Sequence, residues 1–267
     1  MIFEGNNLED NDLNLEIRDG VANITLNRAK QRNAFTSTMI EALDTALNKI
    51  DADKDCRVIV LRGKGGHFCS GWDFHDIHAM CSRGGDALQQ QFKTNLEVLN
   101  KLENHSRVTI SLVEGAVMGF GFSLVARSDI VLAPESCVTA LPEIALGIVP
   151  AIVMVDAQRV LPQKIALEWL LSGRTIASQE ALQAGFFTRV IADADFEDAA
   201  RVSVRQIAEY SPATLARTKE LFRQLIPLSS EQAEQVAIDT AIDALNSAAA
   251  EEGIAAMNEK RSPEWPE

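Results

Sequence analysis

The sequence contains no C-x-x-C spacing and no secretory signal pattern, and these two absences bear on its thiols and its compartment. Its four cysteines are Cys56, Cys69, Cys81 and Cys137. Without a signal or a metal-binding spacing, we expect reduced thiols in a cytoplasmic protein, and we expect no metal site. No apolar run approaches the roughly 20 residues that a membrane span requires, so we expect no membrane partner.

Positive charge and nucleotide-binding motifs are also scarce. Lys and Arg number 25 against 38 Asp and Glu, which gives a formal net charge of −13. This balance argues against nucleic acid and anionic membranes, because both need a basic patch. It is compatible with a small anionic ligand, since a few local cations can override the mean field. The absence of a Walker pattern and of G-x-G-x-x-G disfavours a nucleotide phosphate loop.

What the chain does contain is ample material for a buried core. Its 267 residues are 46% apolar and 24% charged, which is ordinary for a globular protein. This length fits one large domain, or one domain with an appended piece.

The stretch over residues 111–130, SLVEGAVMGFGFSLVARSDI, is the feature around which the rest is organised. An apolar, strand-like run at 108–113 enters a turn with Gly115, Gly119 and Gly121, and a helical pattern follows at 122–127. The start of a helix reached through such a turn presents unpaired N–H groups to an anion or a developing oxyanion. A tightly packed corner without a ligand is the alternative interpretation.

A second turn of the same kind lies about fifty residues earlier. A buried-strand candidate at 57–61 leads into glycines at 63, 65 and 66, and then into HFCSGWD at 67–73. Two main-chain N–H donors aimed at one carbonyl oxygen form an oxyanion hole, which is often the largest single contribution to catalysis.

The remaining segments predict a mixed α/β fold. Alternating runs at Leu13–Arg18 and Val21–Leu26 meet at Asp19-Gly20, which predicts a hairpin. We expect a helix from about Thr38, with a capping box between Thr38 and Glu41. Another helix is expected at 86–103. From about residue 194 the composition becomes rich in Ala, Glu and Leu, and helical patterns follow at 196–210, 213–225 and 230–257.

Several of these segments together resemble the crotonase superfamily, that of enoyl-CoA hydratases and isomerases. The matching stretches occur in the family's order over about residues 13–192: RNAF at 32–35, FCSGWDF at 68–74, EG at 114–115, GFG at 119–121, SDI at 128–130, PEIALGIVP at 142–150, LSGR at 171–174 and ALQAG at 181–185. The resemblance implies an α/β fold with a ββα-spiral core over residues 1–194. It also implies a helical C-terminal region over 195–267 that builds a homotrimer, often paired into a hexamer.

The resemblance also implies an acyl-CoA thioester substrate and a role in fatty acid metabolism, with no cofactor beyond the CoA of the substrate. In the family, two main-chain N–H groups polarise the thioester carbonyl, and they map to Trp72 and to Phe120, which stands where a glycine is usual. The residues implied to hold the CoA are Arg32, Ala34, Ser70, Trp72, Asp73, Phe74 and Phe120, with Arg28 and Lys30 as further phosphate partners. On charge alone, these cations could equally belong to a solvated loop.

The acid–base residues are where the chain departs from the hydratases. Those enzymes use two glutamates, and the corresponding positions here hold Ser123 and Glu143. A serine has no useful acid or base capacity near neutrality. We therefore expect Glu143 to be the acid–base residue, with Ser123 or water sharing the work if the reaction is hydration. The single glutamate is similar to the isomerase pattern. Thioester hydrolysis, decarboxylation and acyl-CoA binding without turnover stay open as alternatives.

Overall fold

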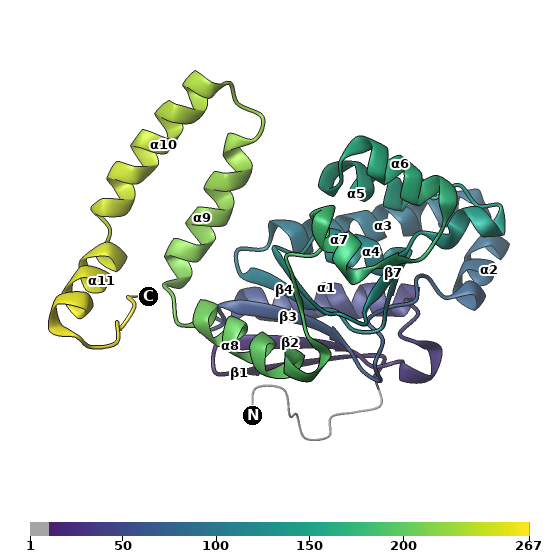
Figure 1. Cartoon of the computed structure of the whole chain (residues 1–267), viewed down its shortest axis with the longest axis horizontal. Helices are drawn as coiled ribbons and strands as arrows, with labels where there is room; N and C mark the ends of the chain where they lie inside the picture. Colours follow the sequence, from purple (N-terminus) through teal and green to yellow (C-terminus); the bar gives the residue numbers. More distant parts are fainter. Residues whose placement is uncertain (1–10, 267) are drawn as a thin grey trace.

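A computed structural model describes residues 11–266 of the chain. Its larger sheet has six strands in the order β1-β2-β3-β4-β6-β9, drawn at the centre of Figure 1. The strands are β1 (Leu13–Arg18), β2 (Val21–Leu26), β3 (Val58–Gly63), β4 (Val108–Leu112), β6 (Ile130–Pro134) and β9 (Arg189–Ile191). Only β1 runs antiparallel to its neighbour, and the other pairs are parallel.

The predicted hairpin between β1 and β2 is confirmed. Asp19 and Gly20 both have positive φ, at 51° and 75°, which is the conformation that an Asp-Gly hairpin turn requires. The predicted capping residue of the next helix was wrong. Helix α1 (Ser37–Ala52) is capped by Thr36, whose side chain accepts from the Met39 N–H, so Thr38 does not cap it. Both threonines precede an apolar helical pattern, and the sequence alone did not separate them.

Both faces of the larger sheet are buried, as parallel sheets require. One face carries Ala22, Ile24, Ile59 and Leu61, and packs with α1, α3 (Gly85–Asn104) and α4 (Phe120–Ala126). The other face carries Val21, Val58, Val60, Ile110 and Leu112, and packs with Phe196, Ala200 and Val204 of α8 (Phe196–Ala208). Thus α8 covers the sheet directly, as Figure 1 shows.

A second, three-stranded sheet in the order β5-β7-β8 holds the turn that leads into α4. Its strands are β5 (Ala116–Met118), β7 (Val138–Ala140) and β8 (Ile176–Ala177). Strand β5 occupies part of what the sequence suggested was only a turn. Beyond β7 come the 3-10 helix η2 (Pro142–Leu146) and the helices α5 (Ala151–Val160), α6 (Gln163–Ser172) and α7 (Ser178–Gln183). The segment after the earlier turn forms α2 (Phe74–Ser82).

The C-terminal region is helical, as expected. Helices α9 (Pro212–Leu225), α10 (Ser230–Leu245) and α11 (Ala248–Glu259) follow α8 and extend away from the sheets in Figure 1. The single helix predicted over 230–257 is broken by Asn246 and by Ser247, which caps α11. A domain boundary at 194 stays a prediction. No helix among residues 11–266 is long and apolar enough to cross a membrane.

Candidate active site

The two glycine turns singled out in the sequence lie against each other. Cys69 pairs with Val117 of β5 in a parallel bridge, and the Met118 N–H donates to the Cys69 carbonyl oxygen at 2.9 Å. Gly71 and Gly119 then meet: a Cβ placed on Gly119 would lie 3.4 Å from the Gly71 Cα. Their φ values of 105° and 49° suit glycine. The residues that follow each glycine are therefore brought together.

Those following residues are Trp72 and Phe120, the two expected oxyanion donors. The Gly71 carbonyl oxygen accepts from the Phe35 N–H, and the Asp73 N–H donates to the Phe35 oxygen, each at 2.8 Å. These bonds flank the Trp72 N–H without using it. Within residues 11–266, neither the Trp72 nor the Phe120 N–H donates a main-chain hydrogen bond. Both are available to a ligand oxygen.

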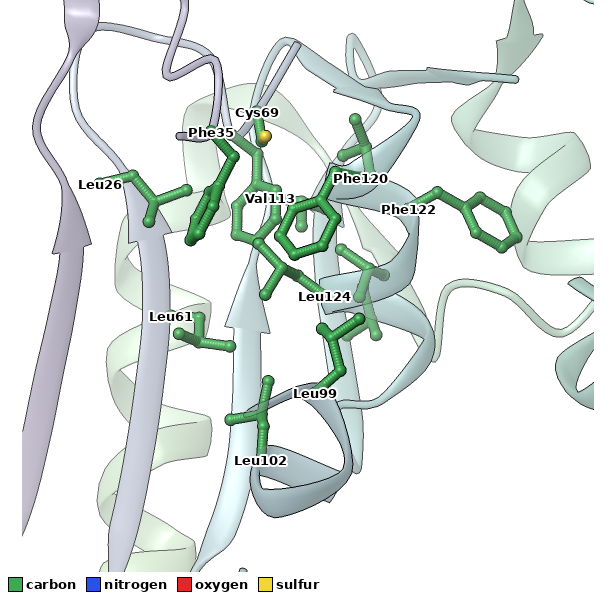
Figure 2. Close-up of a cluster of buried hydrophobic side chains, with 14 of the residues drawn as sticks. Leu26, Phe35, Leu61, Cys69, Leu99, Leu102, Val113, Phe120, Phe122 and Leu124 are labelled. Atoms are coloured by element: carbon green, nitrogen blue, oxygen red, sulfur yellow. The ribbon is translucent and has the colours of Figure 1, made fainter. Parts of the chain in front are cut away.

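The side chain of Phe120 is accommodated by the core. The residue is 7% exposed, and its ring centroid lies 4.8 Å from that of Phe35 and 4.9 Å from that of Trp72. Figure 2 shows the Phe120 ring directed into the buried cluster that holds Phe35 and Leu124, whereas Phe122 points to another side of α4. A phenylalanine at position 120 thus keeps its main-chain N–H free.

Glu143, the expected acid–base residue, lies directly over Gly119. Its Oε1 is 2.8 Å from the place where a Cβ on Gly119 would stand, so only a glycine leaves room for the carboxyl. Its Oε2 is buried and has no hydrogen-bond partner among the described residues. Burial raises the pKa of the Glu143 carboxyl above its ordinary value, which suits a group that takes up and returns a proton.

Ser123 lies one turn further along α4 and is fully buried. Its hydroxyl has no hydrogen-bond partner within residues 11–266. Next to it is a charged group to which the sequence analysis gave no role, Asp156 of α5, which is 1% exposed. One Asp156 oxygen accepts from Arg127 Nε at 2.9 Å, and Arg127 ends the same helix that carries Ser123. The pairing of α4 with α5 could not be deduced from spacing alone.

The residues expected to hold the CoA cluster at the edge of the earlier turn. The Ser70 N–H donates to the Arg32 carbonyl oxygen at 3.0 Å, which joins the two loops. Arg32 itself has a positive φ of 49°, and its side chain is exposed. Phe74 is 62% exposed at the start of α2. These positions line one side of the Trp72 turn.

The Arg28 guanidinium is hydrogen-bonded to other residues of the protein. Its Nη1 donates to the Ala34 carbonyl oxygen, and its Nη2 donates to Asp73 Oδ2 at 3.0 Å. Asp73 also caps α2 by accepting from the His75 and Asp76 N–H groups. Although burial opposes it, this hydrogen bonding holds the pKa of Asp73 below its ordinary value. Arg28 therefore shapes the loop, and the exposed cations Lys30 and Arg32 remain the phosphate partners that we predict.

Cys69 packs against Gly121, just after the Phe120 donor, and its environment disfavours the thiolate that a nucleophile needs. It is fully buried, and burial raises the pKa of its thiol to about 12. No group of three or more His, Cys, Asp or Glu side chains that could hold a metal occurs within residues 11–266. The polar groups that the donor turns bring together are the Trp72 and Phe120 N–H groups and the Glu143 carboxyl.

Comparison with known proteins agrees with this geometry. The family model for enoyl-CoA hydratase/isomerase matches residues 16–267. The chain belongs to the enoyl-CoA hydratase/isomerase family. It is a crotonase-family protein, and the family's enzymes act on acyl-CoA thioesters. The expected superfamily and fold are confirmed.

Relatives of this family match over nearly the whole chain. A mitochondrial enoyl-CoA hydratase domain-containing protein 3 from Rattus norvegicus is 30% identical over 93% of this chain and 82% of its own. A carnitinyl-CoA dehydratase from Proteus mirabilis is 32% identical over 95% of this chain and 97% of its own. The crystal structure of human enoyl coenzyme A hydratase domain-containing protein 3 aligns with a TM-score of 0.90 at 29% identity, covering 96% of this chain and all of that one.

Proposed function

We propose that this protein catalyses the reversible addition of water to a 2-enoyl-CoA, or the reverse elimination from a 3-hydroxyacyl-CoA, through a stabilised thioester enolate. The observation that carries the proposal is the meeting of two free N–H donors, from Trp72 and Phe120, beside the buried carboxyl of Glu143. The likeness to a carnitinyl-CoA dehydratase supports a reaction in which water is eliminated from, or added to, the acyl chain.

In the elimination direction, the thioester oxygen accepts from the Trp72 and Phe120 N–H groups. Glu143 removes a proton from C2, and the electron pair moves onto the thioester oxygen as an enolate. Collapse of the enolate forms the C2–C3 double bond and breaks the C3–O bond, and the proton held by Glu143 passes to the leaving hydroxyl, which departs as water. Buried donors stabilise the enolate more than the neutral thioester, because negative charge on the oxygen strengthens both hydrogen bonds.

Isomerisation of a 3-enoyl-CoA to its 2-enoyl isomer is the second candidate. The observation that favours it is the presence of Ser123 in place of a second carboxylate along α4, because one carboxylate suffices to take a proton from C2 and return it at C4. Both reactions use the same donors and the same Glu143.

Replacing Glu143 by glutamine tests the proposal. The amide is isosteric, so acyl-CoA affinity should stay near that of the unaltered protein, while turnover should fall by the ~10²–10⁴-fold of a lost general acid or base. The matched control is Glu97→Gln, since Glu97 is an exposed residue of α3 outside the site. The assays follow loss of the conjugated enoyl thioester on hydration, and its appearance from a 3-enoyl-CoA.

The result also separates the enzyme from a binding protein. A protein that binds acyl-CoA over a range of chain lengths, shows neither reaction and is unchanged by Glu143→Gln would be a non-catalytic acyl-CoA-binding homologue. Turnover retained at the original rate in Glu143→Gln would remove Glu143 from the mechanism.

A further inference from the structure

A second buried carboxylate, that of Asp156 on α5, is bonded to Arg127 at the end of α4. Arg127 Nε and Nη2 both lie within 3 Å of Asp156 Oδ1, at 2.9 and 2.8 Å. The other oxygen, Asp156 Oδ2, is buried and has no hydrogen-bond partner among residues 11–266. A buried carboxylate with one unpartnered oxygen is unfavourable unless a donor reaches that oxygen.

The hydroxyl of Ser123 can supply such a donor. Ser123 and Arg127 are four residues apart and share a face of α4, and Arg127 on that face is bonded to Asp156. Burial raises the pKa of the Asp156 carboxyl above its ordinary value, and the Ser123 hydroxyl and Arg127 act in the opposite direction. The Ser123 oxygen likewise has no partner among the described residues, and the residue is 0% exposed. A serine hydroxyl turns freely about its bond and carries one donor and two acceptor lone pairs. It can therefore donate to Asp156 Oδ2 and still accept from a ligand.

The position of Ser123 relative to Glu143 decides which ligand group it meets. Gly119 and Ser123 are four residues apart along the turn and α4, so they share one face, about one helical turn or ~5.4 Å apart. Glu143 Oε1 stands over Gly119, and the Cα–Cβ bond of Ser123 leans toward the same end of the helix. With Glu143 at C2 of the acyl chain, a substituent on C3 falls within this span.

We propose that Asp156 is a positioning residue that acts through Ser123. Held by Arg127, the Asp156 carboxylate fixes the Ser123 hydroxyl as a donor toward itself, and this leaves Ser123 Oγ as an acceptor for the O–H of a C3 hydroxyl group or of the water that adds there. The pair takes the place of a second carboxylate and gives the site a preference for 3-hydroxyacyl-CoA thioesters. This inference rests on the proposed function.

The test is calorimetric titration of the full chain carrying Glu143→Gln, which should bind acyl-CoA without turning it over, with 3-hydroxybutyryl-CoA and with butyryl-CoA, which differ by one hydroxyl. One added hydrogen bond predicts a roughly 3–10-fold preference for the hydroxylated ligand. Ser123→Ala and Asp156→Asn should each bring the ratio of the two affinities close to one, while the affinity for butyryl-CoA stays nearly unchanged. The double variant should lose no more than either single variant, because both substitutions remove the same contact.

The control is Glu103→Gln. Glu103 Oε2 accepts from Arg127 Nη1 at 3.0 Å, so this variant perturbs the same guanidinium without reaching Ser123. It should keep the preference, whereas a purely structural role of the ion pairs would make Glu103→Gln and Asp156→Asn behave alike. If Asp156→Asn does not fold, Ser123→Ala decides, since it removes a single oxygen.

Each outcome has a separate meaning. Equal affinities in the Glu143→Gln background, or a preference that survives the addition of Ser123→Ala to it, would overturn the inference and leave the proposed function standing. Failure to bind either thioester would remove the proposed function and this inference with it.

Discussion

Gly119→Ala tests the contact on which the whole site depends. The new methyl group would lie 2.8 Å from Glu143 Oε1 and 3.4 Å from the Gly71 Cα. It must therefore displace the Glu143 carboxyl, the backbone that carries the Trp72 and Phe120 N–H groups, or both. A displaced acid–base group lowers turnover ~10²–10⁴-fold, and one lost oxyanion donor lowers it ~10²–10³-fold. We therefore expect kcat/KM to fall at least ~10²-fold. The backbone at Gly119, with φ 49° and ψ −115°, is unfavourable for alanine and adds a destabilisation of about 1–3 kcal/mol.

The assay pairs kcat/KM with thermal unfolding, and Gly185→Ala is the control. Gly185 has φ 83°, and a Cβ there would meet nothing within 4 Å, so its substitution strains the backbone without touching the site. Both variants should lower Tm, by about 2–4 °C for each kcal/mol, but only Gly119→Ala should lose turnover. Gly119→Ala with unaltered kcat and KM would refute the placement of Glu143 and of the Phe120 donor.

Three further predictions concern charge and assembly. Because burial raises the pKa of Glu143 above 4.5, the acid limb of the pH profile of kcat/KM should lie above that pH. The stability of the native protein relative to Glu143→Gln should fall as pH rises through the raised pKa, because the native state must then hold a buried charge. Urea unfolding of both proteins from roughly pH 4 to 8 measures this difference. Arg127→Ala leaves the buried Asp156 carboxylate without its cation, so urea unfolding should report a loss of about 3–5 kcal/mol. Phe222, Ile226, Leu245 and Met257 are 70–74% exposed on or just after the C-terminal helices, so light scattering should detect a homotrimer or hexamer, and a monomer at micromolar concentration would contradict this.

The parts of the structure that the sequence predicted are those with local physical causes. Asp19-Gly20 selects its hairpin turn through positive φ, and the strand before Gly63 is recognisable from its apolar run. The donor positions Trp72 and Phe120 were predicted through the resemblance, and the free N–H groups agree with it. Their role in catalysis stays a prediction.

The parts that the sequence did not predict depend on contacts between distant segments. Strand β5 exists because Val117 and its neighbours pair with β7 and with Cys69, and three residues carry too little pattern to predict a strand alone. Asp156 follows an apolar stretch, and no spacing in the sequence connects it with the glycine turns. Its significance comes from Arg127 and Ser123, which a different helix supplies.

The positions that constrain the proposed oxyanion hole are the residues before the two donors, Gly71 and Gly119. A main-chain N–H is present whatever the side chain, so Trp72 and Phe120 can be aromatic while their rings pack together at 4.9 Å. Gly71 and Gly119 have no such freedom, because both have positive φ and the two backbones are in contact. The Phe120 ring adds a contact that a glycine could not, since its centroid lies 4.8 Å from that of Phe35 and the ring is directed into the buried cluster (Figure 2). Hydrogen bonds in such an environment are stronger than in water, which favours the enolate over the thioester.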